Sequence, residues 1–225
     1  MDLITSRWSK APRQWSNRQL RRYSHLFSGD VVNVSGWRDE DKDGAHYRDY
    51  FPNATSYSIT NWKPEARGLQ GHPGEIFLDL EKPLAPDLEQ RFDVVFNHTV
   101  LEHVYECRIA FANLCKLSRD IVIVVVPFLQ PYHSDYGDFW RFTPLSMQRL
   151  YAENGLQVMT CTFNEDWMAS VYLFAIGSRN PEKWASHFPE GFSLESPQTK
   201  KWAGARAIPK VRTRFREQLR AFLKR

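Results

Sequence analysis

Short runs of β-branched residues alternate with stretches of helical periodicity from about Asp30 onward. Four short runs have strand character and are bounded by turn residues. They are Val31–Val34, Thr55–Thr60, Glu75–Leu78 and Phe92–Phe96. A fifth run, IVIVVV over 121–126, is apolar on both faces and ends at Pro127. Such a run predicts a central parallel strand that helices cover on both sides.

Two of the helical stretches have recognisable boundaries. The first runs from about Tyr105 to Leu117, and its periodicity places Ile109, Phe111, Ala112 and Cys115 on the inward face. The second covers 144–153. Thr143 suits its N-cap, Pro144 its first helical position, and Gly155 its end.

The last two expected strands, 156–163 and 170–176, are separated only by residues 164–169. That spacing is typical of a hairpin, so the final strand should run antiparallel to its neighbour. Strands that alternate with helices predict a doubly wound α/β sheet. Ligands of such sheets bind outside the carboxyl ends of the strands. The loop after the first strand, which begins Ser35-Gly36-Trp37, is therefore a candidate ligand site.

The chain of 225 residues is 42% hydrophobic, which suffices for one substantial core. Its three cysteines, Cys107, Cys115 and Cys161, form no CxxC pair and suggest neither disulfides nor a zinc site. No apolar run reaches the length of a membrane span, and no signal-peptide pattern opens the sequence. We therefore expect a cytoplasmic protein.

The formal net charge of +4 conceals an uneven distribution. Residues 1–22 carry six basic residues against one acid, and residues 200–225 carry ten against one. Subtracting these from the 30 basic and 26 acidic residues of the chain leaves 14 and 24 for the middle, a net charge of −10. An acidic body is not typical of a nucleic-acid-binding domain. Nucleic acid is therefore not expected as a partner.

These patterns divide the chain into four parts. They are a basic N-terminal extension (1–22), one α/β domain (23–178), an irregular arm (179–208) and a basic C-terminal helix (209–225). In that helix, Val211, Phe215 and Leu219 recur at helical spacing among Lys and Arg. A basic amphipathic helix can lie on an anionic membrane surface, dock on a protein partner, or pack on its own domain. The sequence leaves these three interpretations open.

Several segments, in the same order as the expected strands, resemble class I S-adenosylmethionine-dependent methyltransferases. They are VVNVSGW, YRDYFPNATSYSITNW, LDLEKPL, FDVVFNHTVLEHV and IVIVVVPFLQPYHSDYGDFWRFTP. More narrowly, they are similar to small methyltransferases encoded among bacterial surface-polysaccharide (O-antigen or capsule) genes. The resemblance covers roughly residues 20 to 178. It implies a Rossmann-like fold, with a seven-stranded, mostly parallel sheet whose last strand is antiparallel, and S-adenosylmethionine as cofactor.

The resemblance also assigns a donor site. It implies that the turn after the first strand approaches the methyl donor, S-adenosylmethionine, and that a residue after the second strand binds the ribose. Residues after the third strand would flank the adenine, and residues after the fourth strand would lie beneath the donor. The corresponding residues here are Asn33, Ser35, Gly36, Trp37, Asn61, Asp79, Leu80, Asn97 and His98.

Three of these residues depart from the family pattern. Asn33 and Asn61 stand where acids are usual, and Trp37 stands where a small residue is typical. A neutral amide is a weaker acceptor than a carboxylate. The next segment, Arg38–Asp43, is highly charged and is interpreted as a solvated loop.

The segment PYHSDYGDFWRFTP, over 131–144, is the candidate acceptor site. Methyl transfer to a hydroxyl often needs a base, and His133 is the best candidate because imidazole can be neutral near pH 7. Asp135 or Asp138 could orient His133 or hold sugar hydroxyls, and Asp135 is the second catalytic candidate. The candidate acceptor-binding residues, which offer ring faces, hydrogen bonds or a charge, are Tyr132, Tyr136, Asp138, Trp140 and Arg141.

Structural roles are alternatives for several of these residues. Arg141 could fix the loop by pairing with Asp138 or Glu102, and Trp140 and Phe142 could fill the core. His103 is better explained by helix packing than by catalysis. No metal is expected, because His133, Asp135 and Asp138 lack a metal-ligand spacing signature.

The leading hypothesis is an S-adenosylmethionine-dependent O-methyltransferase that acts on a sugar of a surface glycan or its precursor. The acceptor would be a glycan or a nucleotide- or lipid-linked sugar, and the basic tail would suit contact with the inner face of a membrane. The alternative is a catalytically weak or inactive methyltransferase-like subunit that scaffolds a protein partner or forms a homodimer. Methylation of base amino groups is disfavoured, because Asn97-His98-Thr99 lacks the Asn/Asp-Pro-Pro-aromatic run.

Overall fold

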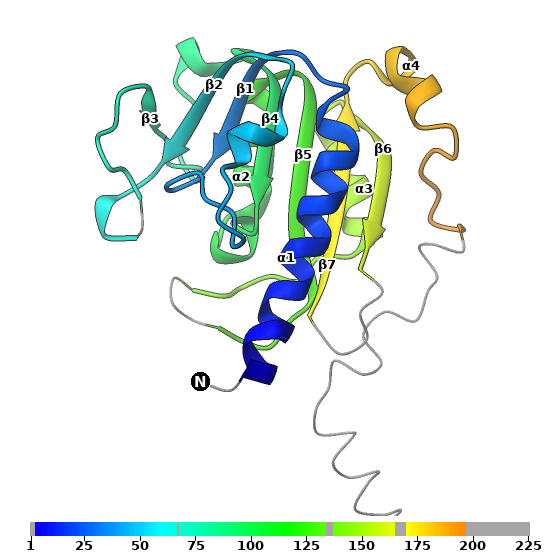
Figure 1. Cartoon of the computed structure of the whole chain (residues 1–225). Helices are drawn as coiled ribbons and strands as arrows, with labels where there is room; N and C mark the ends of the chain where they lie inside the picture. The colour runs from blue at the N-terminus through cyan, green and yellow to red at the C-terminus, as the bar shows by residue number, and fades with distance from the viewer. Residues whose placement is uncertain (1–2, 67, 134–136, 165–169, 197–225) are drawn as a thin grey trace, which may run out of the picture.

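The computed structural model describes residues 3–66, 68–133, 137–164 and 170–196 (Figure 1). A single seven-stranded sheet organises them, with strand order β3-β2-β1-β4-β5-β7-β6. The strands are β1 Gly29–Val34, β2 Ala54–Asn61, β3 Glu75–Phe77, β4 Phe92–His98, β5 Ser118–Leu129, β6 Gln157–Phe163 and β7 Val171–Ser178. The α-helices are α1 Leu3–Ser24, α2 Cys107–Leu117, α3 Pro144–Glu153 and α4 Pro181–Trp184. Short 3₁₀ helices are η1 Tyr47–Tyr50, η2 Pro64–Ala66, η3 Pro86–Leu88, η4 Leu101–His103 and η5 Ala185–His187.

The sheet is parallel except for β7. Strand β7 pairs antiparallel with β5 on one side and with β6 on the other. The other neighbouring pairs, from β3 across to β5, are all parallel. This confirms the expected mostly parallel sheet with an antiparallel last strand.

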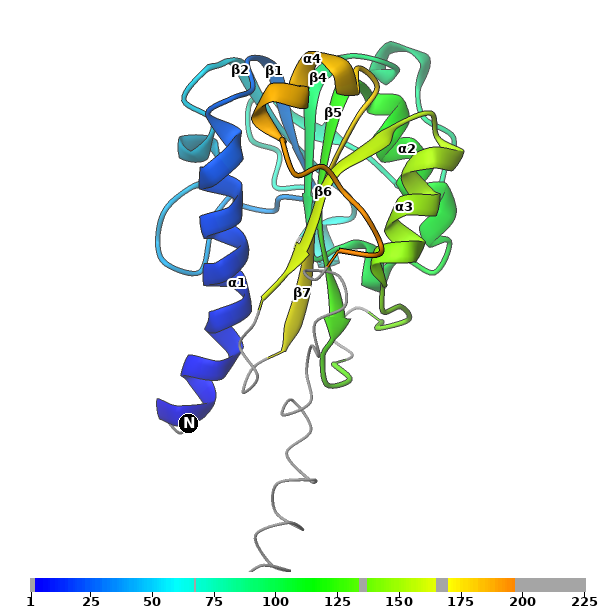
Figure 2. The same ribbon diagram turned by 90° about the vertical axis from the view of Figure 1, so that its right-hand side faces the viewer.

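Helices cover both faces of the sheet (Figure 2). Helices α2 and α3 lie on one face, where Phe111, Leu114 and Met147 are buried against the strands. Helix α1 lies on the other face, above a second buried cluster that includes Phe96 and Phe174. Because each strand between them is covered on both sides, its apolar residues need not alternate with polar ones.

Helix α1 belongs to this packed body. A domain boundary at residue 22 would cut through the helix, which continues to Ser24. Leu20 and Tyr23 on its inner face are buried, and Phe27 follows at the same spacing. The ring of Tyr23 stacks on Phe188 at 5.1 Å, which also attaches the segment after β7 to this helix. Arg18, Arg21 and Arg22 of α1 are exposed beside this apolar stripe, as in other surface helices.

Two local predictions are wrong. Strand β5 does not end at Pro127 but continues to Leu129, with a register irregularity opposite β7. The last residue of β4 pairs with Val125, so Pro127 lies where β5 has lost that neighbour, and a missing N–H is tolerated there. Ile109 was expected to face the core, yet it is 45% exposed on α2.

Helix α3 has the predicted bounds, Pro144–Glu153. The Thr143 hydroxyl accepts a hydrogen bond from the Ser146 N–H, and the Ser146 side chain accepts one from the Thr143 N–H. This reciprocal capping satisfies two backbone donors at the start of the helix. Gly155, just after the helix, has a φ of 74°, a left-handed conformation that favours glycine.

The predicted C-terminal amphipathic helix, 209–225, lies outside the described residues. Across the part of the chain that the structure covers, no helix combines the length and the apolar character needed to cross a bilayer. Membrane contact through the tail thus stays a prediction.

The packing of α1 gives a stability test. We expect Leu20→Ala to lower the free energy of unfolding by about 2–4 kcal/mol, because it leaves a cavity between α1 and the sheet. Arg18→Ala, on the exposed side of the same helix, should change it by less than about 0.5 kcal/mol. Urea unfolding of the full chain measures both. Equal, small effects would show that α1 is dispensable to the domain.

Candidate functional site

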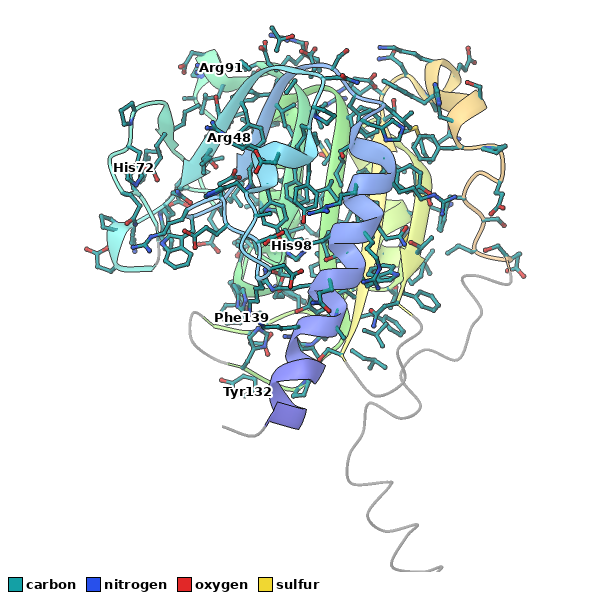
Figure 3. The ribbon with its side chains drawn as sticks, viewed as in Figure 1. Arg48, His72, Arg91, His98, Tyr132 and Phe139 are labelled. Atoms are coloured by element: carbon teal, nitrogen blue, oxygen red, sulfur yellow. The ribbon has the colours of Figure 1, made fainter. Side chains whose placement is uncertain are left out.

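The carboxyl ends of the central strands meet at one edge of the sheet. Val34 pairs with Asn97 across β1 and β4, and His98 pairs with Val125 across β4 and β5. The segments that follow these strands therefore emerge side by side, near the N-terminal half of α1. Figure 3 shows His98, Phe139 and Tyr132 in this part of the molecule. The edge is where the sequence places both the donor and the acceptor.

The turn after β1 keeps a glycine-type backbone although it contains one glycine. Ser35 and Trp37 have φ angles of 57° and 51°, in the left-handed region. For residues with a side chain this conformation costs roughly 1–2 kcal/mol each. Between them, Gly36 lies so close to Asn33 that an added Cβ would be 2.5 Å from Asn33 Nδ2. The turn at the edge of the sheet is thus strained in its backbone and closely packed against Asn33.

Asn61, at the end of β2, holds this turn. Its Oδ1 accepts the Trp37 N–H at 2.7 Å, and its Nδ2 donates to the Trp37 carbonyl at 3.0 Å. The same Nδ2 also donates to Glu75 Oε1 at 2.5 Å. Asn61 is buried, so these partners occupy an amide that was expected to face the ribose. Its position is as the sequence predicts, but its hydrogen bonds serve the turn.

The charged segment after the turn is only partly solvated. Four of its residues are exposed, namely Arg38, Glu40, Lys42 and Asp43. Asp39, however, is 3% exposed and accepts hydrogen bonds from Asn33 Nδ2 (2.8 Å), the Tyr57 hydroxyl (2.6 Å) and the Arg48 N–H (2.9 Å). Asp41 is also buried. The solvated-loop interpretation is wrong for these two acids, because charge alone does not reveal hydrogen-bond partners that lie distant in sequence, such as Tyr57.

Asp41 anchors the second half of the same loop. The Tyr50 hydroxyl donates to it at 2.6 Å, and the N–H groups of Asp43 and Ala45 donate at 2.8 and 2.9 Å. Burial acts to raise the pKa of Asp41, but these hydrogen bonds outweigh it and keep the pKa below its usual value. Burial, with the Asp41 hydrogen bond, raises the pKa of Tyr50 to about 12. The pair is therefore an ionised acid and a neutral phenol near neutral pH.

At the end of β4, Asn97 and His98 are buried. Asn97 Nδ2 donates to the Val34 carbonyl at 3.0 Å, while its Oδ1 has no hydrogen-bond partner. His98 Nε2 lies 2.8 Å from the Ser16 hydroxyl of α1. Burial, followed by the nearby Arg13 charge, lowers the pKa of His98 well below its usual value, so the ring is neutral. Asn97 thus has a side-chain oxygen without a hydrogen-bond donor. His98 is an uncharged ring that its contact with Ser16 holds in place.

The two residues expected beside the adenine differ in exposure. Asp79 is half-buried, and its Oδ1 accepts the Glu81 N–H at 2.9 Å. Leu80 is a core residue under α2, and its carbonyl accepts a hydrogen bond from Asn113 Nδ2. Only Asp79 presents a partly exposed side chain in this pair.

The acceptor segment is built around Asp138. The side chain of Asp138 is 1% exposed and receives both Nη atoms of Arg141, at 2.5 and 2.7 Å. The Arg141 hydrogen bonds, opposed by burial, lower the pKa of Asp138 to about 2. Arg141 also donates to the Gln130 carbonyl. Of the two interpretations of Arg141, acceptor binding and fixing the loop, its contacts therefore favour fixing the loop.

His133 lies against the same carboxylate. Its backbone N–H donates to Asp138 Oδ2 at 3.0 Å, and its Nδ1 lies 3.2 Å from that oxygen. The imidazole is 36% exposed, so one edge remains accessible. Asp138, one of the two acids expected to orient His133, thus lies beside Nδ1, although that nitrogen has no hydrogen-bond partner. Asp135 and Tyr136 lie outside the described residues, and their roles stay predictions.

Exposed aromatic rings border this loop. Tyr132 is 76% exposed, and Trp140 is 39% exposed, which rules out the core-filling alternative for the indole. Phe142, by contrast, is buried. Phe139 meets Tyr105 edge-on at 5.4 Å, and Trp140 Nε1 donates to the Tyr105 carbonyl. An exposed aromatic cluster of this kind is typical of a binding surface.

Glu102, in η4 after β4, is the most unusual group at this edge. It is 1% exposed, and neither carboxylate oxygen has a hydrogen-bond partner. Burial raises its pKa to about 8, against the opposing charges of Arg13 and Arg141. The adjacent His103 donates through Nδ1 to the Gly137 carbonyl, which ties η4 to the acceptor loop. Burial lowers the pKa of His103.

Two contributions from α1 were not predicted from the sequence. Arg13 Nη2 donates to Thr99 Oγ1 at 2.9 Å, and Ser16 contacts His98. The helical spacing of Ser16, Leu20 and Tyr23 was the available signal, since it predicts one face that packs on the domain. Asp39 and Glu102 were also missed, because burial of an acid has no signature in a single sequence.

The Asp39 network makes a direct prediction. Asp39→Ala should lower the free energy of unfolding by about 2–4 kcal/mol, because it leaves the Asn33, Tyr57 and Arg48 donors without their acceptor. Asp49→Ala, at an exposed site of η1, should change it by less than about 0.5 kcal/mol. Chemical denaturation provides the comparison. Indistinguishable variants would restore the solvated-loop interpretation.

Comparison with known proteins shows similarity in structure alone. No family model matches the chain, and no curated protein matches it in sequence. The solved structures that resemble it include a Bacillus halodurans C-125 protein assigned as a methyltransferase, with a TM-score of 0.53 and 10% identity. That match covers 72% of this chain and 98% of the other.

Two further neighbours show the range of the group. One is the 1,6-didemethyltoxoflavin-N1-methyltransferase of Burkholderia thailandensis, solved with S-adenosylhomocysteine, at a TM-score of 0.51 and 14% identity over 75% of this chain and 78% of that one. The other is a Haloferax volcanii complex of a methyltransferase activator with a protein assigned as a methyltransferase. It matches at a TM-score of 0.52 and 11% identity, over 74% of this chain and 90% of that one. The chain therefore has the Rossmann-like fold of class I methyltransferases.

Proposed function

We propose that the protein is an S-adenosylmethionine-dependent O-methyltransferase that acts on a sugar hydroxyl of a surface glycan or its precursor. One observation carries the proposal: the strained turn after β1 and the His133–Asp138 pair after β5 occupy the same edge of the sheet. Methyl transfer needs donor and acceptor in line, with a group that takes the hydroxyl proton. Structural neighbours with this fold act on chemically different acceptors, so the fold supports methyl transfer and not a particular acceptor.

The donor would be held by the turn and the floor beside it. Gly36 lets the backbone approach a ligand closely, and the unpaired Oδ1 of Asn97 is an acceptor without a protein donor. Asp79 is the partly exposed acid next to these groups in the assigned site. S-adenosylmethionine would supply the electrophilic methyl group. The chain supplies backbone approach, hydrogen bonds and a neutral His98 that does not repel the sulfonium.

The acceptor would be positioned by the loop after β5. His133 Nδ1 lies 3.2 Å from Asp138 Oδ2 without a hydrogen bond, and Nε2 would take the proton from an acceptor hydroxyl once Nδ1–H turns onto that carboxylate. The exposed rings of Tyr132 and Trp140 offer flat surfaces on which a sugar ring could pack. The surface-glycan assignment rests on the sequence resemblance of the 131–144 segment. Contact of the basic tail with an anionic membrane would suit a lipid-linked acceptor.

A second candidate function is a methyltransferase-like subunit with weak or no catalysis. It is favoured by Asn61, whose amide is buried and bonded to Trp37 and Glu75 in place of a ribose. The Haloferax volcanii neighbour shows that a chain with this fold can bind an activator protein. A stable co-purifying partner, together with activity that survives loss of His133, would favour this function.

Donor binding is the first test. Titration calorimetry of the folded full chain with S-adenosylhomocysteine should show saturable heat. Gly36→Ala should weaken binding by about tenfold or more, because the added Cβ displaces Asn33 from the turn. Asp49→Ala, at an exposed site of η1 outside the assigned donor site, is the control and should bind as the wild type does. Absence of heat at millimolar ligand would remove the enzymatic proposal.

Loss of the proposed base is the second test. His133→Ala should lower kcat by about 10²–10⁴-fold with glycan precursors and a methyl-labelled donor, while the donor affinity stays unchanged. His72→Ala, at an exposed histidine far along the chain, should have neither effect. Full activity of the His133→Ala protein would show that the proton leaves by another route.

A further inference from the structure

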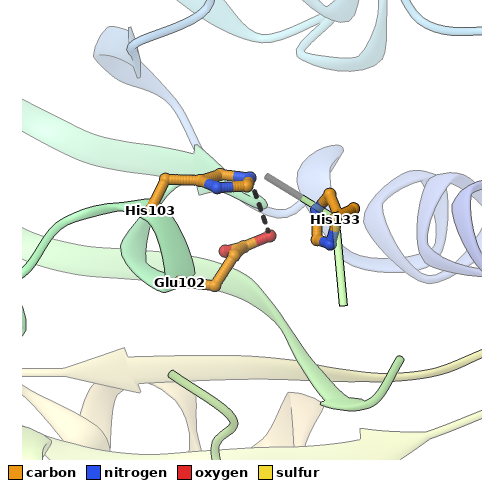
Figure 4. Close-up of side chains that lie close together, drawn as sticks. All are labelled: Glu102, His103 and His133. Atoms are coloured by element: carbon orange, nitrogen blue, oxygen red, sulfur yellow. Dashed lines mark ion pairs between the residues drawn. The ribbon is translucent and has the colours of Figure 1, made fainter. Parts of the chain in front are cut away.

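Glu102, His103 and His133 form a compact cluster that brings η4 together with the loop after β5 (Figure 4). One potential ligand atom from each residue lies within 4.8 Å of the other two. The proposed function assigns no role to Glu102 or His103. Two imidazoles and one carboxylate are a ligand set that binds divalent first-row transition metals in many proteins.

The buried environment of Glu102 favours the binding of a cation. Its side chain is 1% exposed, and both oxygens lack a hydrogen-bond partner. A carboxylate buried without partners is strongly unfavourable unless a positive charge or a proton compensates it. The closest imidazole nitrogen, His103 Nε2, lies 3.8 Å from Oε1, which exceeds hydrogen-bond distance. The carboxylate is therefore directed at the two histidines without being satisfied by them.

The surroundings of the two histidines bear on metal binding in different ways. His103 Nδ1 donates to the Gly137 carbonyl, so this nitrogen carries the proton and Nε2 is the nitrogen that would face an ion. Histidines that ligate metals generally donate their other N–H to a carbonyl or a carboxylate in this way. His133 Nδ1 lies 3.2 Å from Asp138 Oδ2 but has no hydrogen-bond partner. The carboxylate beside His133 is thus close to the ring without fixing it by a hydrogen bond.

The residues beside His133 are linked to one another by hydrogen bonds. Asp138 is held by two hydrogen bonds from Arg141, and Arg141 is held in turn by the Gln130 carbonyl. The two histidine rings meet edge-on with centroids 5.0 Å apart. Ligand atoms around one tetrahedral ion lie roughly 3.3 Å apart, given bonds of about 2.0–2.1 Å. Small side-chain rotations would bring the three ligand atoms to that spacing.

We propose that Glu102, His103 and His133 bind one divalent transition-metal ion, with zinc as the best match to two imidazoles and a carboxylate. Three protein ligands leave at least one coordination position open for water or for a hydroxyl of a bound molecule. The binding site does not depend on the proposed methyl transfer. If transfer does occur here, a bound ion takes the Nε2 lone pair of His133 and polarises the acceptor hydroxyl in place of a free imidazole.

The test uses the full chain without an affinity tag, treated with chelator and dialysed. Calorimetric titration with Zn²⁺ should show one ion bound per chain. Glu102→Gln and His133→Ala should each weaken the binding by about tenfold or more. His72→Ala, which removes an exposed imidazole elsewhere, should bind zinc as the wild type does. The Co²⁺-loaded protein should show an absorption spectrum without thiolate charge-transfer bands, which separates this site from the cysteines.

Thermal melts of the metal-free variants control for folding. Glu102→Gln should melt close to the wild-type temperature, because a side chain of nearly the same shape replaces a buried carboxyl group that has no hydrogen-bond partner. Absence of saturable zinc binding by the folded wild-type chain would overturn the proposal. So would binding that both variants keep, or binding that only one of them loses, since a three-ligand site needs every member. Donor titration is measured separately, so failure of this site and failure of the proposed function are distinguishable.

Discussion

The side-chain amide of Asn61 bonds both backbone groups of Trp37, and the turn at the head of the candidate site depends on this pair of bonds. The turn contains two residues in left-handed backbone, a conformation that persists only where its surroundings fix it. Asn61 does this from the end of the neighbouring strand. The residue to which the family pattern would assign the ribose here supports the turn and bonds Glu75.

Three of the buried carboxyl groups at this edge differ in their hydrogen bonding. Asp39 receives three neutral donors, and Asp138 receives a bidentate guanidinium. Glu102 receives no hydrogen bond. Because an unsatisfied buried carboxylate costs far more than a satisfied one, the first two hold loops in place, whereas the third is the group with unused binding capacity. Acidic residues at this edge thus serve two purposes: Asp39 and Asp138 hold loops in place, and Glu102 is the candidate for binding a ligand.

The edge is also shaped by α1, which lies outside the repeating strand–helix pattern. Arg13 reaches Thr99, and Ser16 meets His98, so a helix that begins the described chain contributes to the floor of the site. Its inner face is fixed by Leu20 and Tyr23 through contacts with the sheet and with Phe188. A basic segment at the end of a chain need not be an appendage, because the same residues can flank an apolar stripe.

The sequence by itself determined the strands, the antiparallel last strand and the capping of α3, because periodicity and caps such as Thr143 are local properties. It also placed Gly36, Asn61 and His133 at the ends of the correct strands. Tertiary structure decided what these residues contact. The partners of Asn61, Asp39 and His133 come from distant segments, and the burial of Glu102 depends on how η4 meets the loop after β5. Hydrogen-bond satisfaction and desolvation act across space, and a single sequence carries no direct record of them.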